Sequence, residues 1–132
     1  MIARGQLRYA RAIALDLHDI ARQVASTAGA DFAFVLSQAG LLVTHDAPRD
    51  MPDSGRTKIL WACPSGKNGE IAHLEMPRQE LVPFGGAAPI DVFAIRVEDT
   101  AILVAAMASW NDKSNVVLAL TSGASGLAEM IR

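Results

Sequence analysis

Two apolar strand pairs constrain most strongly what this chain can fold into. The first runs from Asp31 to His45 (DFAFVLSQAGLLVTH), and the second runs from Ile90 to Met107 (IDVFAIRVEDTAILVAAM). The strands of each pair are too apolar for one face to lie in water, and a short polar turn joins them. A sheet built from these strands needs cover on both faces, so we expect a helix–sheet–helix sandwich.

Amphipathic helices are expected before and after the strand pairs. Between residues 6 and 28 apolar residues recur at helical spacing, and Gly29 is a natural C-terminal stop. These apolar residues are Ile13, Leu17, Ile20 and Val24. A second helical pattern begins at Asn111 or Asp112, both good N-cap residues, and continues to the end of the chain. Gly123 and Gly126 should each weaken that helix by roughly 1 kcal/mol relative to Ala.

The segment between the strand pairs carries a weaker pattern. The apolar stretch Thr57–Cys63 (TKILWAC) lies between prolines, and its length fits either a short helix or an edge strand. Glu70–Met76 (EIAHLEM) alternates in the manner of a strand. The sequence therefore predicts a third strand and leaves the element before it open.

Composition limits the class of protein. A chain of 132 residues with 51% hydrophobic and 20% charged residues can bury one core without disulfides or metals. The formal charge of -2 gives no overall attraction to nucleic acid. Cys63 is the only cysteine, and no apolar run reaches the roughly 18 residues of a membrane span. We expect a single-domain cytoplasmic protein, over residues 1–132, that neither binds nucleic acid nor inserts into a membrane.

The loop PSGKNG, residues 64–69, is similar to a phosphate-binding loop but fails its pattern twice. A P-loop needs Gly five positions before the Gly-Lys pair and Ser or Thr directly after the Lys. Here Trp61 stands at the first position and Asn68 follows Lys67. We expect a plain turn that binds no nucleotide.

Side chains suited to catalysis or metal binding are sparse. Cys63 and His73 could form a nucleophile–base pair, or could bind a metal with His45. The three histidines, at positions 18, 45 and 73, lack the close spacing of a zinc site, and no Gly-x-Ser-x-Gly elbow is present. We expect no enzymatic activity, no metal and no cofactor. A small hydrolase using Cys63 is an alternative supported only by the single thiol.

Two features favour contacts with other proteins. Arg8 and Arg11, together with Arg4 and Arg22, make the first helix basic, which suits either an acidic partner or a solvated helix face. Trp61 lies in a short segment with few local packing partners, and tryptophan is enriched at interface hot spots. Burial of Trp61 against a partner is nearly as well supported as burial in the core.

The order of these elements resembles the Roadblock family, the dynein-light-chain-type regulators of GTPases. The resemblance spans nearly the whole chain and depends mainly on two stretches, ADFAFVLSQAGLLVTH and DVFAIRVEDTAILVAAM. Within the family the chain looks most like the bacterial MglB and MglC types, and most of all like the MglC type. The resemblance implies an α/β (α+β) sandwich with a five-stranded antiparallel sheet flanked by the N- and C-terminal helices. The second helix is expected to be short.

The resemblance also implies a function. It implies a non-catalytic scaffolding role without a bound cofactor, and a homodimer formed through the second helix and the third strand. The implied partners are an MglB-type Roadblock protein, a response-regulator-type polarity protein and, indirectly, a small Ras-like GTPase, with recruitment to cell poles. Because the second helix is short here, we expect dimerisation to depend more on the third strand. The expected interface residues are Ile59, Leu60, Trp61, Ile71, Leu74 and Met76.

A small-molecule sensor domain of similar size is the alternative function. A sensor needs a cluster of polar or aromatic side chains around a cavity. The strands of this chain offer mostly Ala, Val, Leu and Ile, together with Phe32, Phe34 and Phe93, which is typical of a packed core. The adaptor hypothesis is therefore preferred.

Overall fold

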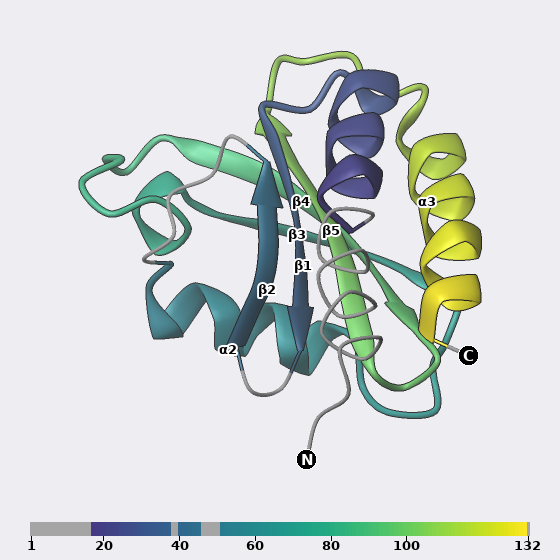
Figure 1. Cartoon of the computed structure of the whole chain (residues 1–132). Coiled ribbons are helices and arrows are strands. Elements are labelled where there is room, and N and C mark those ends of the chain that lie inside the picture. The colour runs from purple at the N-terminus through teal and green to yellow at the C-terminus, as the bar shows by residue number, and fades with distance from the viewer. Residues whose placement is uncertain (1–16, 38–39, 46–50, 132) are drawn as a thin grey trace, which may run out of the picture.

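An antiparallel sheet with the strand order β2-β1-β5-β4-β3 organises the chain (Figure 1). The computed structural model describes residues 17–37, 40–45 and 51–131. The five strands are β1 (Phe32–Ser37), β2 (Gly40–His45), β3 (Ile71–Pro77), β4 (Pro89–Val97) and β5 (Ala101–Ala108). Both predicted strand pairs are confirmed as hairpins, and Glu70–Met76 is confirmed as a strand.

Helices cover both faces of this sheet, which confirms the expected α+β sandwich. A first helix over residues 17–28 and α3 (Val116–Ile131) lie side by side on one face. Helix α2 (Asp53–Ala62) and the short 3-10 turn η1 (Arg78–Glu80) lie on the other. The undecided segment before β3 is therefore a helix, and at 10 residues it is short. The earlier part of the expected first helix, with Arg8 and Arg11, lies outside the described residues.

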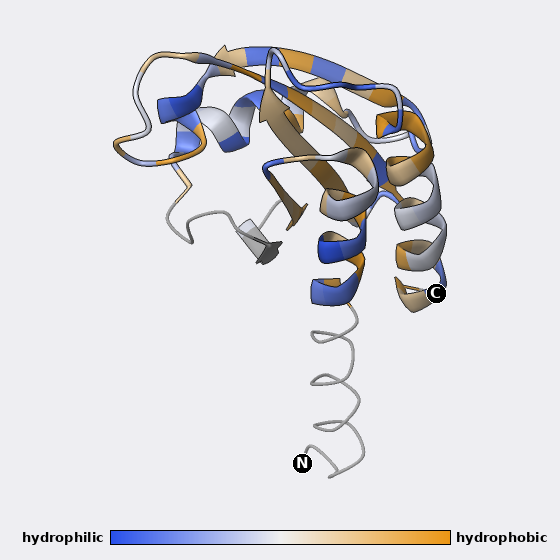
Figure 2. Ribbon diagram, turned by 90° about the horizontal axis from the view of Figure 1, so that it is seen from above, coloured by the Kyte–Doolittle hydropathy of each residue, from blue (hydrophilic) through white to orange (hydrophobic). Residues whose placement is uncertain are grey.

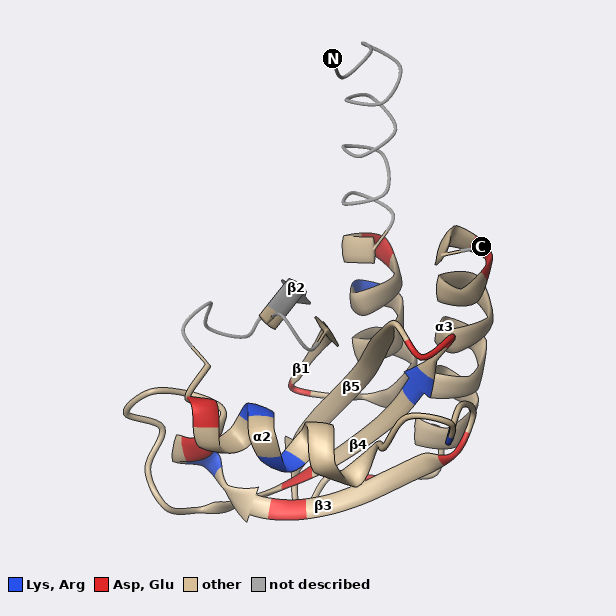
Figure 3. Cartoon of the chain, turned by 90° about the horizontal axis from the view of Figure 1, so that it is seen from below, with Lys and Arg blue, Asp and Glu red and all other residues tan. Residues whose placement is uncertain are grey.

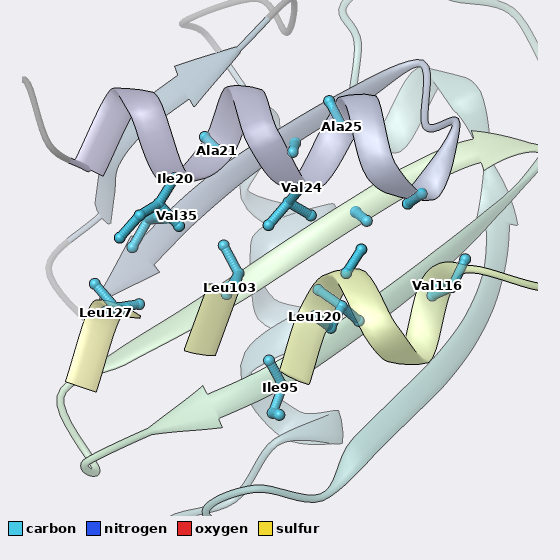
Figure 4. Close-up of a cluster of buried hydrophobic side chains, with 14 of the residues drawn as sticks. Ile20, Ala21, Val24, Ala25, Val35, Ile95, Leu103, Val116, Leu120 and Leu127 are labelled. Carbon is cyan, nitrogen blue, oxygen red and sulfur yellow. The ribbon is translucent and has the colours of Figure 1, made fainter. Parts of the chain in front are cut away.

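Strand β5 lies at the centre of two hydrophobic cores. Every one of its residues is buried, because its alternate side chains point into the two helix-covered faces. The first core contains Val24, Val35, Leu103 and Leu120 among its residues (Figure 4). The second, on the α2 face, contains Phe34, Ile59 and Val104. Colouring by hydropathy shows apolar residues along the central strands and on α3, and hydrophilic residues on α2, on the first helix and along β3 (Figure 2).

The predicted end of the first helix is confirmed at Gly29. This glycine has a φ of 67°, and the Ala30 amide donates to the Ala25 carbonyl at 2.9 Å. A positive φ at this position together with this backward hydrogen bond is a Schellman cap, which satisfies a carbonyl that the helix would otherwise leave unpaired. The chain then turns directly into β1.

The predicted start of the last helix is wrong. Helix α3 begins at Val116, and its first turn includes a hydrogen bond from the Ala119 amide to the Asn115 carbonyl. Asp112 instead accepts hydrogen bonds from the amide and the hydroxyl of Ser114, each 3.0 Å long. An Asx turn therefore competes with N-capping at this residue. The same bonds from Ser114 lower the pKa of Asp112.

Gly123 has a packing role that the sequence pattern did not indicate. A Cβ atom on this residue would lie 2.6 Å from a methyl carbon of Val24 and 2.8 Å from a methyl carbon of Leu103. The glycine therefore lets α3 approach both the first helix and the sheet closely. At Gly126 an added Cβ would lie 3.6 Å from Ile20, which is ordinary contact. Only one of the two glycines is required by packing.

We predict that Gly123→Ala destabilises the fold by roughly 1–2 kcal/mol net, because overpacking costs about 1–3 kcal/mol and improved helix propensity offsets up to about 1 kcal/mol. Gly126→Ala is the matched control, and it should be neutral or stabilising. Urea unfolding followed by circular dichroism measures both variants. Equal stabilisation by the two substitutions would contradict the close packing at Gly123.

Candidate functional site

An open groove lies between α2 and the free edge of the sheet. Strand β3 ends the strand order, so its outer edge has no strand partner among the described residues. The groove has a volume of about 610 Å³. Its lining residues are Asp53, Ser54, Thr57, Lys58, Trp61 and Ala62 from α2, and Leu74, Glu75 and Met76 from β3.

Helix α2 is fixed in place by its inner side. Ile59 is fully buried in the second core, and Gly55 brings the helix against η1, where an added Cβ would lie only 2.0 Å from the Glu80 carbonyl oxygen. Lys58 forms an ion pair with Glu80 at 2.7 Å. These contacts leave the row Asp53, Thr57 and Trp61, at spacing i, i+4 and i+8, on the groove side.

Trp61 is the main apolar feature of this surface. Its side chain is 83% exposed, so the core-packing alternative for this residue does not hold. Leu74, which is half-buried, and Met76, which is buried, form the apolar floor beside it. Acidic and basic residues lie on α2, and an acidic residue, Glu75, lies on β3 (Figure 3). An apolar centre with a charged rim is typical of a protein interface.

The structure distributes the six predicted interface residues unevenly. Ile59 and Met76 belong to the second core, and Leu60 packs against it. Ile71 packs against the first core, on the opposite face of the sheet, because successive strand residues point to opposite sides. Trp61, Leu74 and Met76 are brought together at the groove. As interface residues all six stay a prediction.

The loop at residues 64–69 is a turn fastened to the β4–β5 hairpin. Its Gly66 amide donates to the Asp99 carboxylate at 2.8 Å, and the Asn68 side-chain oxygen accepts from the Asp99 amide at 2.8 Å. The Gly69 amide donates to the Arg96 carbonyl at 3.0 Å. Two amides of the loop are thus bonded within the fold. The predicted turn is confirmed, and the absence of nucleotide binding stays a prediction.

Cys63 and His73 do not form a catalytic pair. Cys63 is buried in the second core, whereas His73 lies on the other face of the sheet, where its ring stacks on Phe93 at 4.6 Å. Burial raises the pKa of the Cys63 thiol, despite the opposing charge of Arg96. Arg96 donates from Nε to the Cys63 carbonyl at 2.6 Å, at the C-terminal end of α2. This pairing satisfies a helix end and gives no activated thiolate.

Among the described residues, no group of His, Cys, Asp and Glu could hold a metal ion. The side chain of His45 is not among those described. Within the same part of the chain, no helix is both long enough and apolar enough to cross a membrane.

Sequence reasoning missed a polar cluster centred on Asp91. Asp91 is only 5% exposed, and its buried carboxylate has two partners. It lies 2.8 Å from His73 Nε2 and 3.2 Å from Lys113 Nζ. Lys113 also donates to the carbonyls of Ser109 and Asn111. The cluster therefore ties β3, β4 and the loop before α3 together. The signal in the sequence was an acidic residue in an otherwise apolar strand.

The pKa of Asp91 reflects opposing effects. Burial raises it, but hydrogen bonds from His73 and Lys113, together with their charges, outweigh burial, so the pKa lies below its ordinary value. A carboxylate that is ionised and partnered in the folded state stabilises the fold at neutral pH.

Comparison with known proteins gives structural neighbours only. No protein-family model matches the chain, and no curated protein does either. Among solved structures, Myxococcus xanthus MglB matches with a TM-score of 0.61 at 11% identity, over 89% of this chain and 89% of that one. The gliding protein MglB from Thermus thermophilus gives a TM-score of 0.55 at 14% identity, over 89% of this chain and 87% of that one.

A third neighbour is described as MglB with a tetrameric arrangement. It gives a TM-score of 0.53 at 14% identity, over 98% of this chain and 92% of that one. The chain therefore shares the fold of MglB over almost its whole length, in agreement with the resemblance drawn from the sequence. The narrower resemblance to the MglC type stays a prediction.

We predict that Asp91→Asn destabilises the fold by about 1–3 kcal/mol at neutral pH, because Lys113 and His73 lose their anionic partner. The folded-state pKa of Asp91 is lowered, so its stabilisation is present above the unfolded pKa of about 3.9 and is lost as pH falls through the folded pKa. The difference in free energy of unfolding between wild type and variant, measured with urea, should therefore become smaller below about pH 4. Asp53→Asn is the control, because that carboxylate is 92% exposed. A gap that does not change with pH would contradict this role.

Proposed function

We propose that this chain is a non-catalytic Roadblock-type adaptor that forms a homodimer through the groove between α2 and β3. The single observation that carries the proposal is the exposed Trp61 above an apolar groove at the free edge of the sheet. The fold shared with MglB supports the family part of the proposal. The nearest type, from the sequence, is MglC.

The free edge of β3 explains why a second copy is a suitable occupant. An edge strand presents unpaired N–H and C=O groups, and soluble proteins usually cover such an edge. A second β3 strand can supply those partners through main-chain hydrogen bonds, while side chains on alternate positions give specificity. Leu74 and Met76 then lie beneath the join, next to Trp61. The dimer would bury the apolar groove and would also pair the free N–H and C=O groups of the β3 edge.

In a cell, the adaptor would link an MglB-type Roadblock protein, and through it a small Ras-like GTPase, to a response-regulator-type polarity protein. An adaptor needs surfaces and no reactive centre. In support, Cys63 and His73 lie on opposite faces of the sheet, and the amides of Gly66 and Gly69 are bonded within the fold. The sensor alternative is less well supported, because the groove is open and its floor is apolar.

The wild-type chain should be a homodimer in the tens of micromolar range by sedimentation equilibrium. Trp61→Ala should weaken self-association by about 2 kcal/mol, which is roughly thirtyfold. Trp110→Ala is the matched control, since Trp110 is 81% exposed but lies in the loop after β5. Cys63→Ser should also leave association nearly unchanged. A monomeric wild type would sink the proposal.

We also predict that the chain neither binds nor hydrolyses GTP. Calorimetric titration with GTP and Mg²⁺ should give only heats of dilution, because the amides of Gly66 and Gly69 are already bonded. Lys67→Ala should behave identically to wild type. Micromolar binding that Lys67→Ala abolishes would establish a nucleotide site and overturn the adaptor proposal.

A further inference from the structure

The loop between β3 and β4 presents an aromatic side chain outward in an unfavourable backbone conformation. Phe84 is 105% exposed and has a φ of 63°. This φ lies in the left-handed region, which residues other than Gly, Asn and Asp rarely adopt. The exposure means that the ring gains no packing within its own chain. Backbone strain of this kind is a feature of binding surfaces, where an external contact compensates for it.

The loop around Phe84 is internally braced. The Arg78 amide donates to the Ala88 carbonyl at 2.9 Å, and the Gly85 amide donates to the Val82 carbonyl at 2.9 Å. Below them, Leu81 is buried in the second core, and Glu80 is paired with Lys58 of α2. The backbone of the loop is therefore held in a fixed position relative to α2, so little loop freedom is lost on binding.

Phe84 and Trp61 lie at opposite ends of the surface formed by α2 and β3. The N-terminal end of α2 lies at the end of β3, where Gly55 meets Glu80. The C-terminal end of α2 lies near the start of β3, where Arg96 bonds the Cys63 carbonyl and accepts from the Gly69 amide. Helix α2 therefore runs opposite to β3. The Phe84 loop continues from the end of β3, and Trp61 lies toward its start.

A two-fold axis through the middle of β3 places these two ends beside each other. Antiparallel pairing of two β3 strands brings the end of one strand to the start of its partner. The loop of each copy then faces the C-terminal end of the other copy's α2. We propose that Phe84 packs into the partner's groove against Trp61, and that a symmetric dimer contains two such contacts. This inference rests on the dimer proposed above and names the residues that lock it.

A second copy is favoured as the occupant because both halves of the contact belong to one chain. The loop is continuous with the strand that forms the proposed interface, and the groove of about 610 Å³ is large enough to take an aromatic ring. A self-complementary pair of this kind closes around a two-fold axis and stops at a dimer. The same contact made without a two-fold axis would give open chains, which sedimentation would detect.

The test is a double-mutant cycle on the full chain, with the dissociation constant measured by sedimentation equilibrium. Phe84→Ala and Trp61→Ala should each weaken self-association by roughly tenfold or more. The double variant should be no weaker than the stronger single variant, because both substitutions remove the same contact. If the fold-changes in dissociation constant of the two single variants multiply in the double variant, Phe84 and Trp61 are not in contact and the inference fails.

Phe84→Gly separates the contact from folding. Glycine adopts a positive φ without strain, so the monomer of this variant should unfold at a higher urea concentration than the wild-type monomer. Its self-association should be as weak as that of Phe84→Ala. In a Trp110→Phe background Trp61 is the only tryptophan, and its emission should shift to the blue on association only when Phe84 is present. An unchanged dissociation constant for Phe84→Ala, with Trp61→Ala weakened, would overturn this inference and leave the proposed dimer intact. A monomeric wild type would overturn both.

Discussion

The complete burial of β5 is the constraint on which the rest of the structure depends. A strand whose side chains on both faces must avoid water requires a layer of helix above and below it. The first helix and α3 supply one layer, with Gly123 allowing their close approach, and α2 with the η1 loop supplies the other. Because α2 has only 10 residues, it covers its face incompletely and leaves a groove at the β3 edge. The candidate site is thus a consequence of how a two-faced sheet is covered by a short helix.

Two polar clusters among the described residues hold connecting loops against the sheet. Asp91, His73 and Lys113 fasten the loop before α3 to the sheet. On the other face, Arg96 fastens the end of α2, and Asp99 fastens the turn that follows it. Each cluster therefore holds a connection in place beside the sheet. Both clusters therefore give polar side chains a structural role at these connections.

Much of the fold could be predicted because strand and helix periodicity are local signals. The two hairpins, β3 and the helix end at Gly29 were all readable from the sequence. The start of α3 was not, because Asp112 can cap either a turn or a helix and the surrounding packing decides between them. Tertiary contacts also decided the role of Gly123 and the face on which Ile71 lies. At the site, the sequence indicated Trp61, but nothing local could reveal that Phe84 is exposed at a positive φ.

The sheet also separates the two cores, so that none of the described side chains belongs to both. Substitutions that repack the first helix against α3 are therefore felt only weakly at the α2 surface, since the backbone of the sheet lies between them. Residues on the proposed interface around Trp61 can therefore be substituted without repacking the larger core. A chain arranged in this way can keep its fold at 11% identity to M. xanthus MglB while its proposed binding surface diverges. Division of the interior into two independent halves is thus a source of evolutionary freedom.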